Sequence, residues 1–233
     1  MVNRRKKFVQ QQKMILIGLA VIVVSIALYF TTVVVSDSSN DTFVEGEHYV
    51  LLDEPRRIRG KKIEVMEFFS YGCIHCYNFD EDIQTWAEER SDSVRFIQTP
   101  AVANQQWRDH GRAYYTMEEL DLLENGHLLM FKQIHDASRN FRSAEDYASV
   151  LASGEVSEEA FSSMFSSQAI TEKVNRADQI ARQVRVSTVP SLVVHGKYQI
   201  RVGGSIGFSR MLDVADFLIE KELSARQPSS KVN

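Results

Sequence analysis

The chain has 233 residues, of which 44% are hydrophobic, 25% are charged and 10% are aromatic. This is a globular composition, and it excludes a wholly disordered or collagen-like chain. Two cysteines and a net charge of −4 also exclude a disulfide-stapled scaffold, a four-cysteine metal site and a basic nucleic-acid-binding surface.

A basic tail precedes a long uncharged segment at the N-terminus. Residues 1–13 contain five Lys or Arg and no acid, and residues 14–35 contain no charged side chain. These 22 residues would span about 33 Å as a helix, against about 30 Å for the hydrocarbon core of a bilayer. We therefore expect a transmembrane anchor over residues 14–35, with residues 1–13 as a cytoplasmic tail.

The charges that flank this segment predict its orientation. Acids such as Asp37 and Asp41 follow it, and the first cation beyond it is Arg56. An excess of positive charge before the segment places the rest of the chain outside the cytoplasm, in the periplasm or outside the cell. The alternative is a cleaved signal peptide with a weak cleavage site at residues 34–36, which would release a soluble periplasmic protein.

The next part of the chain has a β-α-β pattern. After a polar linker over residues 36–43, alternation predicts an edge strand over residues 46–52 and an apolar run predicts a buried strand over residues 63–69. A helix begins near Cys73, and a further strand covers residues 94–99. This order predicts a parallel pair of strands joined by the helix.

Residues 104–184 form a block without any strand pattern. Ser143 and Ser157 are typical helix starts, and an amphipathic pattern predicts a long helix over residues 168–183. We interpret the block as an all-helical insertion.

The strand pattern returns after this insertion. Residues 191–195 and 198–202 read as a hairpin, followed by a helix over residues 209–225. Residues 44–103 and 185–226 together are long enough for one α/β domain with its own core. Residues 227–233 are polar and predict a flexible tail.

The two cysteines, Cys73 and Cys76, lie three residues apart where a buried strand meets a helix. A structural disulfide would close so short a loop that it would stabilise the fold by only roughly 2 kcal/mol. A metal site lacks further ligands, because no other histidines show zinc spacing. The strand–turn–helix setting favours a redox-active dithiol.

The start of a helix suits a thiolate at Cys73. Unpaired backbone N–H groups and the positive end of the helix dipole favour an anion there, and His75 adds to this effect when it is protonated or donates a hydrogen bond. A stabilised thiolate makes Cys73 a better leaving group and its disulfide a stronger oxidant. Cys76 lies one turn further into the helix, so we expect it to be more buried.

The run Phe68-Phe69-Ser70-Tyr71-Gly72-Cys73-Ile74-His75-Cys76 resembles the active site of the bacterial DsbA family of thiol–disulfide oxidoreductases. The resemblance covers nearly all of residues 44–225, including the helical block and the Val189-Pro190 pair before the hairpin. It implies an α/β, thioredoxin-like fold with an inserted all-helical domain. The transmembrane helix expected over residues 14–35 would precede this fold and departs from the freely soluble form of the family.

The resemblance also assigns roles to single residues. It implies that Cys73 is the nucleophilic cysteine, that Cys76 is its resolving partner, and that His75 tunes the thiolate. Glu67 matches the buried acid that moves a proton to or from the inner cysteine. The family has a cis-proline where this chain has Pro190, and there the backbone at the position of Val189 pairs with the substrate. The candidate site therefore consists of the catalytic residues Cys73, Cys76, His75 and Glu67 and the substrate-binding residues Val189 and Pro190.

The expected activity is donation of the Cys73–Cys76 disulfide to reduced or unfolded secreted proteins. No metal or organic cofactor is expected, and the family implies re-oxidation by a DsbB-like quinone-linked membrane protein. Ile74 stands where the best-known members have proline, so a membrane-tethered reductase or isomerase remains an alternative. A chaperone-like binding module without redox turnover is a further alternative.

Overall fold

The computed structural model describes residues 14, 18, 22–25, 43–203 and 206–226. The chain divides into two units, residues 1–42 and 43–233, and each is described by itself. The expected basic tail, most of the expected anchor, the linker up to Thr42 and the C-terminal tail lie outside the described residues. Among the described residues, no helix is long and apolar enough to cross a membrane.

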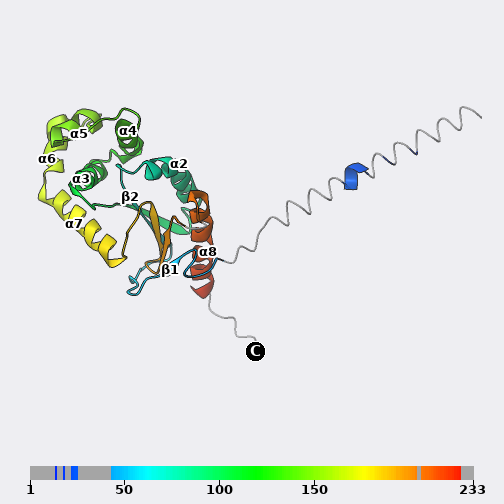
Figure 1. Cartoon of the computed structure of the whole chain (residues 1–233). Coiled ribbons are helices and arrows are strands. Elements are labelled where there is room, and N and C mark those ends of the chain that lie inside the picture. The colour runs from blue at the N-terminus through cyan, green and yellow to red at the C-terminus, as the bar shows by residue number, and fades with distance from the viewer. Residues whose placement is uncertain (1–13, 15–17, 19–21, 26–42, 204–205, 227–233) are drawn as a thin grey trace, which may run out of the picture. The chain divides into compact units, whose positions relative to one another are not determined.

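A mixed sheet of five strands lies at the centre of the second unit, in the order β1-β5-β4-β2-β3 (Figure 1). β2 and β3 are parallel, and the other three neighbouring pairs are antiparallel. The predicted parallel pair and the predicted hairpin are therefore confirmed. The strands are β1 (Val50–Leu51), β2 (Ile63–Phe69), β3 (Val94–Pro100), β4 (Ser191–Val194) and β5 (Tyr198–Arg201).

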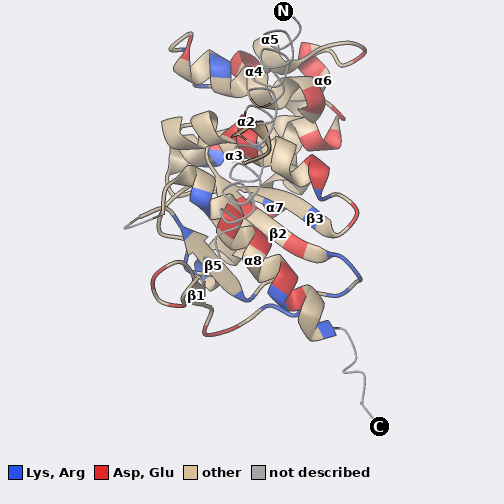
Figure 2. Cartoon of the chain, turned by 90° about the vertical axis from the view of Figure 1, so that its right-hand side faces the viewer, with Lys and Arg blue, Asp and Glu red and all other residues tan. Residues whose placement is uncertain are grey.

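The central strand β2 is buried along its whole length, as its nearly continuous apolar run predicts. Ile63 and Val65 belong to a core shared with helices α2 (Ile74–Glu89) and α8 (Phe208–Arg226). Side chains alternate along a strand, so Glu67 lies on the same face as Val65. β2 therefore carries two buried acidic residues, Glu64 and Glu67, and acidic segments are visible along this strand in Figure 2.

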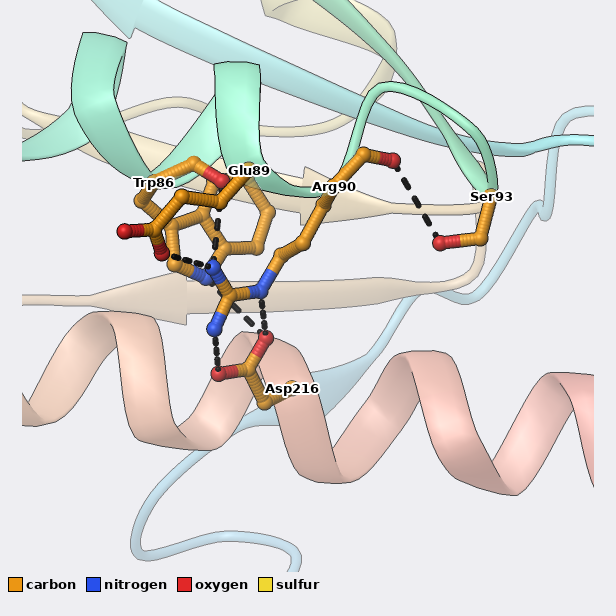
Figure 3. Close-up of polar contacts among 5 residues, drawn as sticks. All are labelled: Trp86, Glu89, Arg90, Ser93 and Asp216. Atoms are coloured by element: carbon orange, nitrogen blue, oxygen red, sulfur yellow. Dashed lines mark hydrogen bonds and ion pairs between the residues drawn. The ribbon is translucent and has the colours of Figure 1, made fainter.

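Helices α2 and α8 are joined by a polar clamp (Figure 3). The Arg90 guanidinium donates from Nε and Nη2 to the two carboxylate oxygens of Asp216, at 2.6 and 2.7 Å. Trp86 Nε1 also donates to Asp216, at 3.0 Å, and the guanidinium lies 5.0 Å from the centre of the Trp86 ring. The clamp holds the C-terminal end of α2, whose N-terminal end carries the two cysteines.

Five helices follow one another between β3 and β4 (Figure 1). Ser143, Ser157 and Ser167 cap three of them, because each hydroxyl accepts a hydrogen bond from a backbone N–H in the first turn. Part of this helical block shares one apolar core with Phe69 and Cys76. The helices are α3 (Gln105–Glu119), α4 (Leu123–His135), α5 (Ala144–Leu151), α6 (Glu158–Phe165) and α7 (Gln168–Gln183).

The N-terminal edge of this unit differs from expectation in two ways. The strand expected over residues 46–52 is reduced to Val50–Leu51, because Gly46, with a φ of 87°, opens a turn in which its N–H donates to the Tyr49 carbonyl. Phe43, expected in the linker, is buried against α8, with its ring 5.6 Å from that of Phe217. The second unit therefore begins at Phe43, which packs into its core.

Candidate active site

The two cysteines lie where β2 ends and α2 begins. The turn between these elements is closed by a hydrogen bond of 3.0 Å from the Cys73 N–H to the Ser70 carbonyl. Gly72 is needed here because a Cβ atom at this position would lie 2.8 Å from the Trp107 indole nitrogen. The turn therefore holds Cys73 tightly against the helical block.

Cys73 is the N-cap residue of α2, and its sulfur accepts a hydrogen bond of 3.3 Å from the Cys76 N–H. The pKa of the Cys73 thiol is lowered from 9.0 to about 6, chiefly by a hydrogen bond from the Cys76 thiol. Backbone N–H groups of Cys76 and His75 and the charge of His75 add to this effect, and partial burial opposes it. Cys73 is thus a half-buried group that ionises near neutral pH.

Cys76 has the opposite character. It is 1% exposed, and burial raises its pKa, as does the neighbouring Cys73 sulfur. Both cysteines are free thiols in this structure. The pair consequently joins one accessible thiolate to one buried thiol, an asymmetry that makes Cys73 the sulfur which an incoming thiolate can reach.

The side chains between the two cysteines face outward. His75 is exposed, and its ring packs on Phe208 of α8 with 5.4 Å between ring centroids. Ile74 is 46% exposed. His75 is the last of the causes that lower the pKa of Cys73, so the start of the helix contributes more to the thiolate than the histidine does.

The Val189–Pro190 peptide bond is cis, as the resemblance implies, and it lies beside the dithiol. The Cys73 thiol donates to the Val189 carbonyl over 3.6 Å. A cavity of about 340 Å³ lies against this loop, and its wall includes Val189 on one side and Trp107 of α3 on the other. The structure thus brings together Cys73 and Val189, which are 116 residues apart in the chain.

Glu67 is buried on the α2 side of the sheet, with 1% of its surface exposed. Its carboxylate accepts a hydrogen bond of 3.0 Å from the Gln98 side chain on β3. Burial raises the pKa of Glu67 from 4.5 to about 8, and the negative charges of Asp80 and Cys73 add to this, while the Gln98 hydrogen bond opposes it. Glu67 therefore holds a proton at neutral pH.

A buried polar network behind Glu67 does not follow from the sequence. His127 of α4 lies at its centre: Nδ1 is 2.7 Å from the Tyr71 hydroxyl, and Nε2 is 3.0 Å from the Asp80 carboxylate. Gln98 lies 3.3 Å from the same His127 nitrogen. The one signal in the sequence is Asp80, an acid within the buried stripe of α2.

This network borders a cavity of about 870 Å³ between α2 and α4. Asp80, Gln98 and His127 contribute to its wall. In the described part of the chain, no cluster of His, Cys, Asp and Glu has the arrangement of a metal site.

Comparison with known proteins agrees with this geometry. Residues 64–217 match the DSBA-like thioredoxin domain family. The thiol:disulfide interchange protein DsbA of Pseudomonas aeruginosa is 36% identical over 186 residues, which cover 79% of this chain and 88% of that protein. The protein of the same name from Azotobacter vinelandii is 35% identical over 165 residues, covering 71% of this chain and 77% of the relative.

Solved structures give the same result. The crystal structure of Pseudomonas aeruginosa DsbA superposes with a TM-score of 0.76 at 35% identity, covering 81% of this chain and 99% of that one. The oxidoreductase NmDsbA1 of Neisseria meningitidis superposes with a TM-score of 0.68 over 81% of this chain and 97% of that one, and at 18% identity it shows the fold alone. The chain belongs to the DsbA-like thioredoxin family, with the thioredoxin-like fold and the mixed sheet of that family.

Proposed function

We propose that this protein donates the Cys73–Cys76 disulfide to thiols of other proteins. The chain is a thiol:disulfide oxidoreductase, in keeping with relatives that are named thiol:disulfide interchange proteins. The observation that carries the direction is the asymmetry of the pair: the pKa of Cys73 is lowered to about 6 while that of buried Cys76 is raised. A stabilised thiolate favours the reduced enzyme, so the disulfide is readily given away.

The reaction begins with the disulfide form. A substrate thiolate attacks the Cys73 sulfur, the bond between Cys73 and Cys76 breaks, and the electron pair passes to the Cys76 sulfur. Glu67 supplies the proton that converts this sulfur into a thiol. A second substrate thiolate then attacks the substrate sulfur of the mixed disulfide and releases Cys73 as a thiolate.

Val189 and Pro190 form the binding edge for the substrate backbone. The Val189 carbonyl lies 3.6 Å from the Cys73 sulfur, so an extended substrate segment linked to Cys73 can pair with it as an added strand. The cavity between this loop and Trp107 offers room for a neighbouring side chain of the substrate. His75 supports the thiolate from the exposed side of the helix.

The substrates are reduced or unfolded secreted proteins, and the catalytic unit works outside the cytoplasm. Support comes from the five cations of residues 1–13 and the uncharged segment that follows them. Residues 14–35 anchor the chain in the cytoplasmic membrane, with the soluble periplasmic form as the product if they are cleaved. A DsbB-like quinone-linked membrane protein restores the disulfide. The bond itself is the redox centre.

Two cysteine variants of the full-length protein test this function. Cys73→Ser should abolish oxidation of a reduced secreted protein, because no mixed disulfide can form. Cys76→Ser, incubated with a substrate that contains a disulfide, should instead accumulate a mixed disulfide, because the Cys73 thiolate attacks the substrate disulfide and no Cys76 thiol is present to release it; non-reducing electrophoresis detects this covalent complex. Disulfide formation that persists in Cys73→Ser would overturn the proposal, and retained binding without turnover would favour the chaperone-like alternative.

A reductase or isomerase is the second candidate, and the observation that favours it is Ile74, which lies between the two cysteines where the best-known members have proline. The residues between the cysteines set how strongly the helix start stabilises the thiolate. Equilibration of the Cys73/Cys76 couple against glutathione buffers decides between the two. A couple more oxidising than glutathione supports disulfide donation, and a thioredoxin-like reducing couple supports the reductase or isomerase.

A further inference from the structure

The loop between β1 and β2 carries a strong positive charge that the active site does not use. Residues 56–62, called the basic loop below, contain five Lys or Arg and no acid. Figure 2 shows blue segments, which mark Lys and Arg, beside the last turn of α8. The final residue of that helix, Arg226, donates from Nη1 to the Lys61 carbonyl at 2.7 Å. The basic loop therefore lies against the C-terminal end of α8.

Neighbouring elements hold the backbone of the basic loop in place. The Arg56 N–H donates to the Gly196 carbonyl, in the turn between β4 and β5, at 2.8 Å. The approach is close, because a Cβ atom on Gly196, whose φ is 65°, would lie 2.8 Å from the Arg56 carbonyl oxygen. At the other end of the loop, Lys62 Nζ donates to the Ser91 carbonyl at 2.5 Å. The loop thus presents its side chains from a defined backbone.

The five cations of the basic loop divide into two kinds. Arg56 and Lys62 bind other groups of the same domain. The remaining three are exposed, and within the described part of the chain their side chains form no ion pair or hydrogen bond. These three are Arg57, Arg59 and Lys61. Exposed cations without a partner in their own chain are available to an external anion, above all to phosphate oxygens.

The acids that flank the loop offset only part of this charge. Asp53 pairs with a cation outside the loop, at 2.6 Å. Glu64 is buried between the guanidinium groups of Arg56 and Arg95. Exposed Glu54 precedes the loop and balances one of the three unpaired cations at most. The surface of the basic loop is therefore positive.

The position of the basic loop selects its partner. Phe43, the first residue of the second unit, packs on Phe217 of α8. From Phe217 to Arg226 the helix advances about 14 Å. Residues 36–42, which separate the uncharged segment from Phe43, reach at most about 25 Å. A chain anchored through residues 14–35 therefore keeps the basic loop within about 40 Å of lipid headgroups, whose effective concentration is then high.

We propose that the basic loop binds anionic phospholipid headgroups and so docks the catalytic domain on the membrane that holds residues 14–35. The inference rests on the anchor proposed above and adds an electrostatic contact to it. Arg57, Arg59 and Lys61 bind the headgroup phosphates. Each cation near an anionic membrane surface favours binding about fivefold, so three cations favour the docked state by on the order of a hundredfold.

Docking through this loop directs the dithiol away from the bilayer. α8 begins at Phe208, on which the His75 ring packs with 5.4 Å between centroids, and ends at Arg226 beside the basic loop. Its 19 residues extend over about 28 Å. Cys73 and the basic loop therefore lie at opposite ends of α8, and a docked domain presents Cys73 to secreted chains rather than to lipid.

Lysine acetylation of the full-length protein in lipid nanodiscs tests the docking. Discs of phosphatidylcholine alone are compared with discs of phosphatidylcholine and phosphatidylglycerol in equal parts. Mass spectrometry follows the reaction of Lys61 with a water-soluble acetylating reagent, with Lys132, an exposed lysine of α4, as the internal reference. We expect Lys61 to react at least about fivefold more slowly in the anionic discs, and Lys132 to react equally fast in both.

Salt provides a second check on the same samples. Near roughly 1 M salt the Debye length falls to about 3 Å, so the protection of Lys61 in anionic discs should be lost. Protection that persists at this salt concentration, or that is equally strong in discs of phosphatidylcholine alone, would overturn the proposal, because neither result depends on the headgroup charge.

The double variant Arg57→Gln/Arg59→Gln removes two of the three unpaired cations and keeps Lys61 as the reporter. Loss of two cations weakens docking about 25-fold, so the protection of Lys61 should fall by at least about threefold. Arg142→Gln/Arg176→Gln is the matched control, because it removes two exposed arginines of the helical block and changes the net charge equally. It should keep the native protection. Equal protection in the two variants would contradict a specific role of the basic loop.

The same discs separate this inference from the proposed function. Size-exclusion chromatography shows whether the chain is incorporated into the discs. A chain that elutes apart from them overturns the anchor and, with it, the docking. An incorporated chain whose Lys61 reacts equally fast in both kinds of disc overturns the docking alone. Disulfide donation by Cys73 is measured separately and depends on neither result.

Discussion

Two buried glutamates on β2, three residues apart, have opposite surroundings. Glu64 is 2% exposed and is held by two guanidinium groups, those of Arg56 at 3.3 Å and Arg95 at 2.5 Å. Glu67 is as deeply buried, yet within the described part of the chain no Lys or Arg pairs with it, and its partner is the neutral Gln98 amide. The two side chains lie on opposite faces of one strand.

This difference in partners suits Glu64 to a structural role and Glu67 to proton transfer. The Glu64 carboxylate, held by two guanidinium groups, ties the loop before β2 to the neighbouring strand β3. A buried carboxylate without a cation keeps its proton, because the charged form is poorly solvated. Only the second can supply a proton at neutral pH, and it is the one that lies on the side of the dithiol helix.

Replacement of Glu67 should change the free energy of unfolding more than any other substitution considered below. The pKa of Glu67 is about 8 in the folded protein against 4.5 ordinarily, so between these values the folded chain keeps a proton that the unfolded chain has lost. This contribution is fully present below pH 4.5 and is lost as pH rises toward 8, at roughly 1.4 kcal/mol per unit. The Glu67→Gln variant has no such loss. We expect its free energy of unfolding at pH 7 to be about 3 kcal/mol larger than that of the native protein.

Urea unfolding of the reduced protein at several pH values between 5 and 8 measures this difference. The curves for Glu67→Gln and the native chain should diverge as pH rises. Parallel curves would mean that Glu67 is ionised in the folded protein and that the contrast with Glu64 does not exist.

A smaller effect of opposite sign is expected at Glu64. Glu64→Gln leaves two guanidinium groups without their carboxylate, which destabilises a fully buried pair by several kcal/mol. The Arg56 and Arg95 side chains are 21% and 54% exposed, so water replaces part of the lost contact and we expect a loss of about 2 kcal/mol. Urea unfolding at pH 7 is the measurement. Glu54→Gln, at an exposed acid nearby, is the control and should unfold like the native protein.

A third prediction concerns the pKa of Cys73, whose charge helps to raise the pKa of Glu67. Removal of the His75 charge by His75→Ala should raise the pKa of Cys73 above its value of about 6, by less than one unit, because the His75 charge is the smallest of the effects that lower this pKa. Thiolate absorbance at 240 nm during a pH titration gives this value, with Cys73→Ser as the blank. A rise larger than that would mean that His75 supports the thiolate more strongly than its place behind the hydrogen bonds from the Cys76 thiol and the backbone N–H groups allows.

Short sequence patterns were sufficient to predict most of the fold and the cysteine pair of the site. The apolar run of β2, the serines that cap α5 and α6, and the spacing of Cys73 and Cys76 are all readable within a few residues. Glu67 was identifiable because an acid in a buried strand is unusual. The resemblance to a family, and not the sequence pattern alone, supplied the cis bond before Pro190.

The remainder of the site depends on contacts between distant segments. His127 lies 47 residues from Asp80 and 56 from Tyr71, and no spacing in the sequence indicates that these side chains meet. Gln98 reads as an ordinary strand residue until the parallel register places it opposite Glu67. Burial of Phe43 was likewise hidden, because its aromatic partner Phe217 lies in the last helix.

The clamp between Arg90 and Asp216 makes α2 a beam with one fixed end (Figure 3). A helix of 16 residues is about 24 Å long and stiff over that length. Its other end carries Cys73. We expect the movements that accompany making or breaking the bond to Cys76 to be confined to the first turn of α2 and the loop before it. The fixed C-terminal end would then keep the Cys73 sulfur beside the Val189 carbonyl.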